Sequence, residues 1–482
     1  MQFFRMHAFQ PPQPLKKPVL GELLEDVSLA RMKGVRYKRW SETAPFWLGN
    51  AGISRPYSEF TCRPYTTYKN LLSNFEQNKS SMIFYEYAFG MEEIRKDIKS
   101  VFGDCTILFD SNGSTLISTL AKGVKARRQH EPDSMTFSDT GRLVYSALAF
   151  ETPSIRQLNT NFEQPLGIFD YPAPEKYPFR QEIPESVRVI NIFSHDASGY
   201  IPKDDSLLLH ELEQMLKTNK KICLFLLLHV SRTGRILPVE KMASMIKSKK
   251  PDAYVFVDGC QAVGRLPYEE IRRAFDASDA YVFVGHKALG SMVCGAAALK
   301  RGVEEWLFFP AIENDFLFNL RLFQFESIEI NELVAKKQVE KKLPNYMVSL
   351  PEIMSLRLAL SHSIENFAKQ RPTVEWAKEE ILDLLFSFGA LHPIGRANHV
   401  NDIVSFFTSP PSLARKIKDA LQNPPLLGSK KCRIDLPITI APITDDGAAR
   451  IAIDPKIESL PEAIGTLKTR LISIMQEVSA RF

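Results

Sequence analysis

Short hydrophobic runs alternate with longer amphipathic stretches between about residues 90 and 310. Continuous hydrophobic runs of strand length predict β-strands that are buried on both faces of a sheet. The runs are CTILF (105–109), VRVINIF (187–193), CLFLLLH (223–229), AYVFVDG (253–259), AYVFVGH (280–286) and CGAAALK (294–300). Helical patterns separate several of them, such as DSLLLHELEQMLKTN (205–219) and PVEKMASMIKSKK (238–250). The alternation predicts an α/β domain with a large, doubly wound and mainly parallel sheet.

The pattern changes after about residue 310. Long helical patterns lie around 351–389, and three strand-like runs and an amphipathic helix follow: VNDIVSFF (400–407), CRIDLPITI (432–440), ARIAIDP (449–455) and residues 459–478. Strands followed by a closing helix predict a smaller C-terminal α+β domain. We therefore expect an N-terminal arm (1–45), a large α/β domain (46–315), and a connecting helix with the small domain (316–482).

Composition restricts the classes of partner. The 482 residues carry a formal net charge of only +5, and the basic residues are scattered, so we expect no nucleic-acid partner. Six cysteines without a CxxC pair argue against a zinc site or a disulfide framework. The N-terminus does not resemble a secretory signal, and the longest hydrophobic run (222–230) is too short to cross a bilayer. We expect a cytoplasmic protein with no metal site and no membrane partner.

Polar residues follow three of the predicted strands, namely His229, Asp258 and Lys287. Doubly wound sheets bind ligands at the carboxyl ends of their strands, so these residues could line one crevice. A lysine that is desolvated there can form a Schiff base. A buried carboxylate needs a partner, and a protonated pyridine nitrogen would provide one, with Gln261 near the ring hydroxyl. The alternatives are a surface lysine and a turn aspartate.

Two further segments are candidates for the same crevice. FDSNGSTLISTLAKGVKA (109–126) places a small polar turn before a helical pattern, and Ser114 and Thr115 could bind phosphate at that helix N-terminus. Simple N-capping by Ser111 or Asn112 is the alternative. HVSRTGRILPV begins at His229 and would also place Ser231 at the crevice, although a lone histidine at a strand end is more often structural.

Three blocks in order, HVSRTGRILPV, VFVDGCQAVGRLP and AYVFVGHK, resemble the class V aminotransferase superfamily of pyridoxal-phosphate enzymes. This superfamily includes the cysteine desulfurases. The close match covers about residues 224–299, and a looser one extends from FWLGNAG (46–52) to the C-terminus. The resemblance implies an aspartate-aminotransferase-like fold of type I, pyridoxal 5'-phosphate as cofactor, a small amino-acid substrate and a homodimer.

The resemblance also implies roles for matching positions. Lys287 would form the Schiff base and move protons, while Asp258 would pair with the pyridine nitrogen and Gln261 with the ring hydroxyl. The remaining implied contacts are phosphate or ring contacts from His286, Ser114, Thr115, His229, Ser231 and Phe137, and substrate contacts from Arg450 and Asn50. The bidentate guanidinium of Arg450 suits a substrate carboxylate.

The sequence departs from the family at several positions. Val284 replaces a serine or threonine before the Gly-His-Lys, and Leu343 replaces a threonine that reaches the phosphate of the other subunit. Arg232 stands where an asparagine is common, and Phe137 is the one candidate for the residue that stacks on the ring. These departures reduce the expected contacts to the cofactor.

Three functions are compatible with these residues. The first is an aminotransferase. The second is a cysteine desulfurase or C–S lyase, for which Cys432 in GSKKCRIDLP would supply a thiolate. The third is a non-catalytic scaffold that retains the fold. Retention of Lys287, Asp258, Gln261 and Arg450 favours an enzyme.

Overall fold

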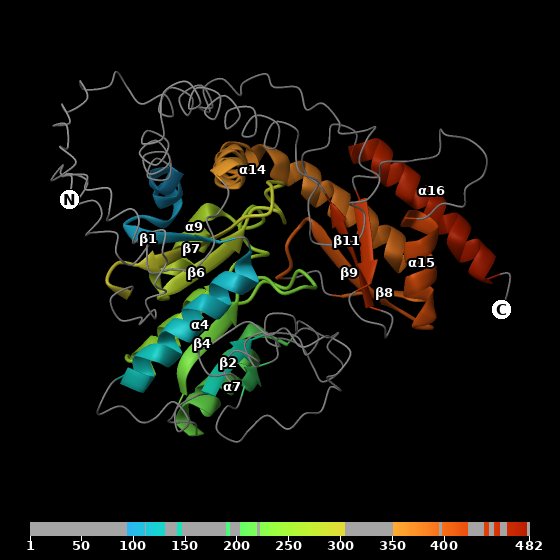
Figure 1. The fold of residues 1–482 in the computed structure, drawn as a ribbon. Helices are drawn as coiled ribbons and strands as arrows, with labels where there is room; N and C mark the ends of the chain where they lie inside the picture. Colours follow the sequence, from blue (N-terminus) through green and yellow to red (C-terminus); the bar gives the residue numbers. More distant parts are fainter. Residues whose placement is uncertain are drawn as a thin grey trace, which may run out of the picture.

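The computed structural model describes residues 94–110, 112–130, 142–146, 189–192, 203–218, 222–303, 350–394, 398–422, 438–442, 448–453 and 460–479. These residues form two β-sheets with their helices, each around a hydrophobic core (Figure 1). The expected N-terminal arm and the expected boundary between 315 and 316 lie outside the described residues.

The large sheet has the strand order β1-β7-β6-β5-β4-β2-β3. Its strands are β1 (Cys105–Asp110), β2 (Arg142–Ser146), β3 (Val189–Ile192), β4 (Ile222–Leu228), β5 (Tyr254–Asp258), β6 (Ala280–Val284) and β7 (Gly295–Lys300). All six hydrophobic runs that predicted strands are confirmed. The sequence pattern did not identify β2, whose segment RLVYS is short and half polar.

Most neighbouring strands of this sheet are parallel, as predicted, but β7 runs antiparallel to both β6 and β1. The link between β6 and β7, residues 285–294, is shorter than the dozen or more residues that a parallel crossover requires. The short link therefore makes this pair antiparallel. The fold class of a mainly parallel sheet is confirmed.

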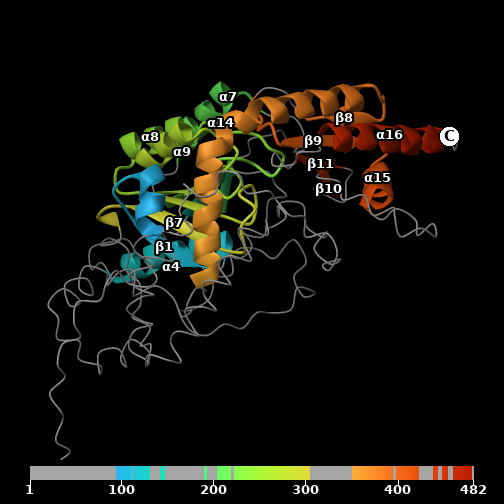
Figure 2. The same cartoon turned by 90° about the horizontal axis from the view of Figure 1, so that it is seen from above.

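Helices cover both faces of the large sheet, which confirms the doubly wound arrangement. One face carries α4 (Gly113–His130), and the other carries α7 (Asp205–Thr218), α8 (Val239–Lys249) and α9 (Tyr268–Asp276), as Figure 2 shows. In α9, hydrophobic residues three and four positions apart, Ile271, Ala274 and Phe275, are buried against the sheet. This amphipathic spacing was not recognised in the sequence pattern because α9 is short.

The small sheet has the order β10-β11-β9-β8 and is antiparallel throughout. Its elements are β8 (Leu391–Pro393), β9 (Ile403–Thr408), β10 (Ile438–Pro442), β11 (Ala448–Ile453), α15 (Ser412–Gln422) and α16 (Leu460–Ser479). The predicted strands at 400–407 and 449–455 and the final helix are confirmed. Of the predicted strand at 432–440, the described residues begin at 438.

Helix α14 (Leu350–Phe386) connects the two parts. Its first half, including Ile353 and Leu360, packs in the core of the large sheet, while its second half, including Ala377 and Leu385, packs in the core of the small sheet. Figure 2 shows that the helix bends between these halves. Pro372 lies inside the helix, where it removes a backbone hydrogen bond and causes a kink.

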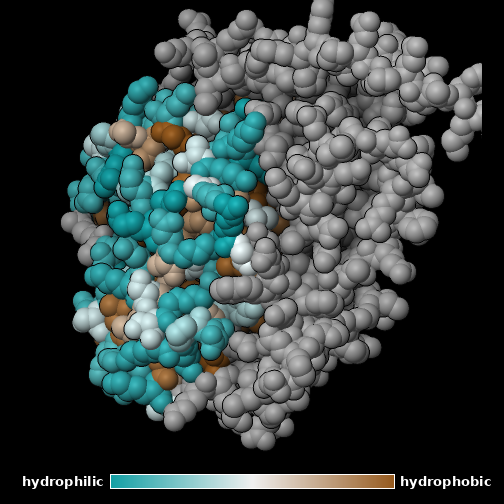
Figure 3. All heavy atoms as spheres, turned by 90° about the vertical axis from the view of Figure 1, so that its left-hand side faces the viewer, coloured by the Kyte–Doolittle hydropathy of each residue, from teal (hydrophilic) through white to brown (hydrophobic). Residues whose placement is uncertain are grey.

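The face in Figure 3 is mainly hydrophilic, and hydrophobic side chains of the described residues lie there in small, separate groups. None of the described helices is long and hydrophobic enough to span a membrane.

Candidate functional site

The carboxyl ends of β5 and β6 bring Asp258, His286 and Lys287 into one region. The two strands are parallel neighbours, with Asp258 opposite Val282, and the turn that follows β6 carries His286 and Lys287. The positive charge of Lys287 acts on both His286 and Cys260, and Cys260 lies beside Asp258. The structure thus places these predicted residues at one edge of the sheet.

The N-terminus of α4 packs directly on this edge. A Cβ atom at Gly113 would overlap the Cys260 sulfur and would lie 3.0 Å from Cγ1 of Val284. Only a glycine fits this close approach without displacing its neighbours. The predicted phosphate-binding turn and the strand ends are therefore adjacent, as the interpretation of the sequence required.

Asp258 is 7% exposed, and one carboxylate oxygen accepts a hydrogen bond from the Cys260 backbone N–H at 3.0 Å. Burial, reinforced by the negative charge of Asp258, raises the pKa of the Cys260 thiol well above its usual range. Cys260 is thus a neutral packing residue next to Asp258.

Among the described residues, the side chains of His286 and Lys287 have few partners. The Nδ1 atom of His286 is buried and has no hydrogen-bond partner among the described residues. Burial, together with the charge of Lys287, lowers the pKa of His286 to about 4, so this ring is neutral at pH 7. No hydrogen bond or ion pair to the Lys287 ammonium is present in the described part of the chain. Buried polar atoms normally have partners, so this region suits a polar ligand.

At the start of α4, Asn112 is the N-cap. Its side-chain oxygen accepts hydrogen bonds from the Thr115 backbone N–H at 2.9 Å and the Thr115 hydroxyl at 3.1 Å. This is the capping alternative that the sequence left open, with Asn112 in the role. Phosphate binding by Thr115 remains a prediction, and it requires at least one of these contacts to be exchanged. Ser114 lies half-buried in the same first turn.

Gln261 lies near Asp258 but is tied to Arg265. The Arg265 guanidinium donates to the Gln261 side-chain oxygen at 2.8 Å and to its backbone oxygen at 3.2 Å, and pairs with Asp402 at 2.6 Å. The Gln261 oxygen is therefore occupied, which directs its NH2 group toward other acceptors. The sequence did not single out Arg265 or Asp402, because their meeting across 137 residues has no local signal.

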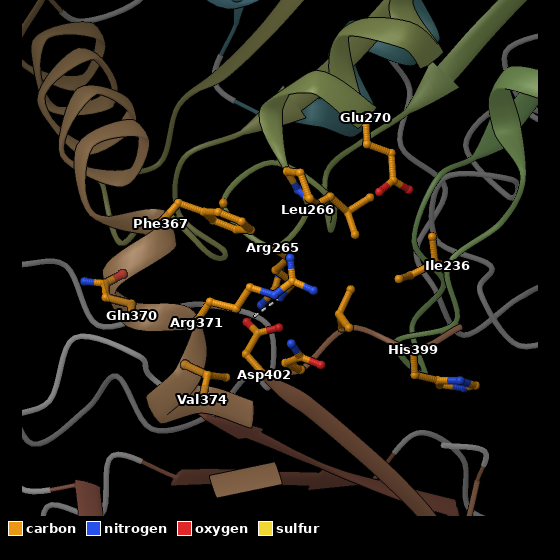
Figure 4. A pocket seen from close by; sticks show the side chains of 14 residues that line it. Ile236, Arg265, Leu266, Glu270, Phe367, Gln370, Arg371, Val374, His399 and Asp402 are labelled. Carbon is orange, nitrogen blue, oxygen red and sulfur yellow. Dashed lines mark hydrogen bonds and ion pairs between the residues drawn. The ribbon is translucent and has the colours of Figure 1, made fainter. Parts of the chain in front are cut away.

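A pocket of about 160 Å³ lies beyond this ion pair, between α9, α14 and residues 398–402 (Figure 4). Its lining includes the charged groups Arg265, Glu270, Arg371 and Asp402. It contains none of the predicted site residues and is separate from the strand-end region.

His229 and Ser231 both have partners within the protein, and their expected contacts with a cofactor remain a prediction. His229 is 2% exposed, and its Nδ1 atom lies 2.7 Å from the Tyr281 hydroxyl while Nε2 lies 3.8 Å from a Glu270 oxygen. The Ser231 hydroxyl bonds to the Thr233 hydroxyl at 2.8 Å and accepts the Arg235 backbone N–H at 3.1 Å. Both side chains hold the chain locally, which is the structural alternative noted for the histidine. Tyr281 and Glu270 were missed because a strand tyrosine and a helix glutamate look ordinary in sequence.

Arg450 comes from β11 of the small sheet and reaches the loop after β4. It is 3% exposed, and its Nη1 atom donates to the Arg232 backbone oxygen at 2.9 Å. On the neighbouring strand, the Ser405 hydroxyl donates to the Thr233 backbone oxygen at 2.8 Å. The small domain therefore brings its buried arginine against the loop that follows His229. Arg232, which stands where the family commonly has an asparagine, contributes its backbone carbonyl to this contact.

Other predicted positions lie outside the described residues, namely Asn50, Phe137, Leu343 and Cys432.

Comparison with known proteins agrees with this geometry. Residues 199–308 match the family model of aminotransferase class-V. The expected resemblance to the class V aminotransferases is confirmed. This class V segment contains Asp258, Gln261, His286 and Lys287. A search of curated protein sequences gave no match.

Solved structures share the fold of the chain. A NifS-like protein has a TM-score of 0.61 at 16% identity, with 87% of this chain and 97% of that chain covered. A cystine C–S lyase, in complex with its reaction product cysteine persulfide, has a TM-score of 0.59 at 15% identity. The match covers 85% of this chain and 93% of that chain. An alanine–glyoxylate aminotransferase from Nostoc sp. has a TM-score of 0.52 at 14% identity. The match covers 79% of this chain and 86% of that chain. The predicted fold type I is confirmed, because pyridoxal-phosphate enzymes of this type share it.

Proposed function

We propose that this chain is a pyridoxal-phosphate enzyme that acts on a small amino acid, with transamination as its reaction. The observation that carries the proposal is the meeting, at one sheet edge, of Lys287 and Asp258 of the class V segment with the N-terminus of α4. When bound, the cofactor supplies an electron sink that labilises bonds at the α-carbon of an amino acid.

The residues present fit this cofactor. Its ring nitrogen is a cation that matches the buried Asp258 carboxylate, and its aldehyde requires an amine such as Lys287. Its phosphate requires donors, which the first turn of α4 and the unpaired Nδ1 of His286 offer, since a neutral imidazole can carry a proton there. The NH2 group of Gln261, oriented by Arg265, suits the ring oxygen.

Each chain residue then has a defined task. Lys287 anchors the aldehyde carbon and, once displaced by a substrate amine, moves a proton at the α-carbon. Asp258 keeps the ring nitrogen protonated. Arg450 binds the substrate carboxylate at the edge where the small domain meets the loop after β4. The homodimer and a cytoplasmic location remain part of the proposal.

Thiol chemistry at the described cysteines is disfavoured. Cys105, Cys260 and Cys294 are all buried, and burial raises the pKa of both Cys260 and Cys294 well above the usual range. A desulfurase needs an accessible thiolate near the substrate sulfur. Transamination needs none, so we place it first. C–S bond cleavage is the second candidate, because a cystine C–S lyase shares the fold, and it would depend on Cys432 or on no thiol.

The reaction is tested by incubating the protein and pyridoxal phosphate with a panel of amino acids, each with and without a keto-acid acceptor. Transamination predicts a new amino acid that forms only with the acceptor and is unaffected by Cys432→Ala. Release of sulfide or persulfide without an acceptor, and its loss in Cys432→Ala, would instead establish a desulfurase.

A further inference from the structure

Three polar groups, of which two are buried and one is partly exposed, form a row next to the turn that carries Asp258. The Tyr281 hydroxyl lies 2.7 Å from Nδ1 of His229, and the row ends at Glu270, 3.8 Å from Nε2. Tyr281 is fully buried and His229 nearly so, while the Glu270 side chain is 33% exposed. Figure 4 shows Glu270 projecting from α9 at the edge of the pocket.

This row lies on the opposite face of the sheet from the Asp258 side chain. Tyr281 pairs with Val257 across β5 and β6, so the two side chains share a face. Successive side chains of a strand alternate between faces, which places the Asp258 carboxylate on the other side. The row therefore contacts the turn after β5 from the face of the sheet opposite the Asp258 carboxylate.

Two contacts connect the row to Asp258. The His229 backbone N–H donates to the Asp258 backbone oxygen at 3.0 Å. Gly259, the next residue, lies so close to the Tyr281 ring that a Cβ atom there would overlap the ring carbons. A movement of the Tyr281 ring toward Gly259 would therefore displace the turn between Asp258 and Cys260.

The charges along the row assign its protons. Burial, reinforced by the charge of Asp258, raises the pKa of Tyr281 well above its usual range, so the phenol keeps its proton. The interaction with His229 lowers the pKa of Glu270, which is a carboxylate at neutral pH. A carboxylate near Nε2 favours the tautomer with the proton on Nε2. Nδ1 is then the acceptor for the Tyr281 hydroxyl.

We propose that Glu270 is a positioning residue for Asp258: its carboxylate fixes the Nε2–H tautomer of His229, so that the Tyr281 hydroxyl is held under Gly259 and the Asp258 carboxylate is held in place. The role of Asp258 toward a cofactor rests on the proposed function. The contacts that position it do not, because they exist within the chain alone.

The first test uses the protein without cofactor. Nitrogen-15 spectra of the histidine rings, with the His229 signal identified by His229→Gln, report which ring nitrogen carries the proton. The amide signal of Cys260 reports the Asp258 carboxylate, since this amide donates to it. Glu270→Ala should move the ring proton from Nε2 toward Nδ1 and shift the Cys260 amide. Glu269→Ala, at the exposed neighbouring position, should do neither. An unchanged ring tautomer or an unchanged Cys260 amide in Glu270→Ala overturns the proposal.

The second test adds pyridoxal phosphate and follows its absorption. Glu270→Ala should weaken binding about tenfold, as happens when a hydrogen-bond partner behind a ligand is removed. Glu270→Gln should recover most of the affinity, because the partial negative charge of its amide oxygen near Nε2 also favours the Nε2–H tautomer. Equal affinities of wild type and Glu270→Ala contradict the proposal. If the wild type binds no cofactor, the proposed function fails, and the cofactor-free spectra still decide the role of Glu270.

Discussion

The strand-end turns at 258–261 and 285–289 lie next to the loop at 229–236, and both regions are rich in polar side chains. In the loop these groups bind one another: Ser231 to Thr233, His229 to Tyr281, and the guanidinium of Arg235 to the Asp205 carboxylate. In the strand-end turns, the His286 ring and the Lys287 ammonium have no such partners among the described residues. The Nε atom of Arg235 is also buried without a partner among the described residues, so the contrast lies in the number of bonds made. The loop side chains make several, whereas the His286 and Lys287 side chains make none there, which suits a binding site.

We expect the largest loss of stability from breaking the buried ion pair between Arg265 and Asp402. Its side chain is 4% exposed and pairs with Asp402, 11% exposed. Arg265→Ala leaves that carboxylate without its cation and should lower the free energy of unfolding by about 3–5 kcal/mol. Denaturant unfolding measures this loss. Arg273→Ala, which breaks an exposed pair with Glu240, is the control and should cost about 0–1 kcal/mol. Equal losses in the two variants would show that burial of the pair is unimportant.

Asp258→Asn should affect cofactor binding but not the stability of the fold. The asparagine oxygen can still accept from the Cys260 N–H, so stability should change little. Loss of the negative charge opposite the ring nitrogen should weaken pyridoxal-phosphate binding by about 10- to 100-fold, the worth of one charge-assisted hydrogen bond. Absorption titration measures the affinity. A large loss of stability with intact binding would make Asp258 a structural residue.

Ser231→Ala tests whether the hydrogen bonds of the loop at 229–236 serve stability or cofactor binding. It removes the hydroxyl that accepts from the Arg235 N–H in a fully buried turn and should lower the free energy of unfolding by about 1–3 kcal/mol. Cofactor affinity should remain within about twofold of the wild type, since this difference is well below 1 kcal/mol. Ser100→Ala, at an exposed position, is the matched control. A selective loss of cofactor binding in Ser231→Ala would restore the cofactor contact expected from the sequence.

The last prediction concerns the pH dependence of stability. The pKa of His286 is about 4 in the folded protein, below its ordinary value of 6.5, so the unfolded chain takes up a proton first as the pH falls. The free energy of unfolding should therefore decrease as the pH is lowered from about 6.5 toward 4. His286→Asn should reduce this decrease, whereas His210→Asn, at an exposed position of α7, should not. The same pH dependence in both variants would contradict the assignment.

The sequence was sufficient for features that depend on local pattern. Uninterrupted hydrophobic runs identified six of the seven strands of the large sheet, and the three motif blocks lie within the segment that matches the class V family model. The direction of β7 was implicit in the short link between β6 and β7, but the alternation of strands and helices concealed it.

The sequence was insufficient where function depends on partners distant in the chain. The partners of the His229 ring within the protein are Tyr281, which lies 52 residues away, and Glu270 on α9. Whether Gln261 presents its oxygen or its NH2 group is decided by Arg265, which is in turn held by Asp402 of the small domain. Each such group includes residues that are far apart in the chain, so no fixed spacing in a single sequence reveals that they meet.

We propose that the Lys287 ammonium lacks a hydrogen-bond or ion-pair partner among the described residues because it binds the cofactor. The most direct test is the absorption spectrum of the purified protein with pyridoxal phosphate, for wild type, Lys287→Ala and Lys300→Ala, the last removing an exposed lysine of the same segment. The account predicts a visible band of bound cofactor in the wild type and in Lys300→Ala that is absent from Lys287→Ala. No band in the wild type with excess cofactor, or the same band in all three proteins, would contradict it.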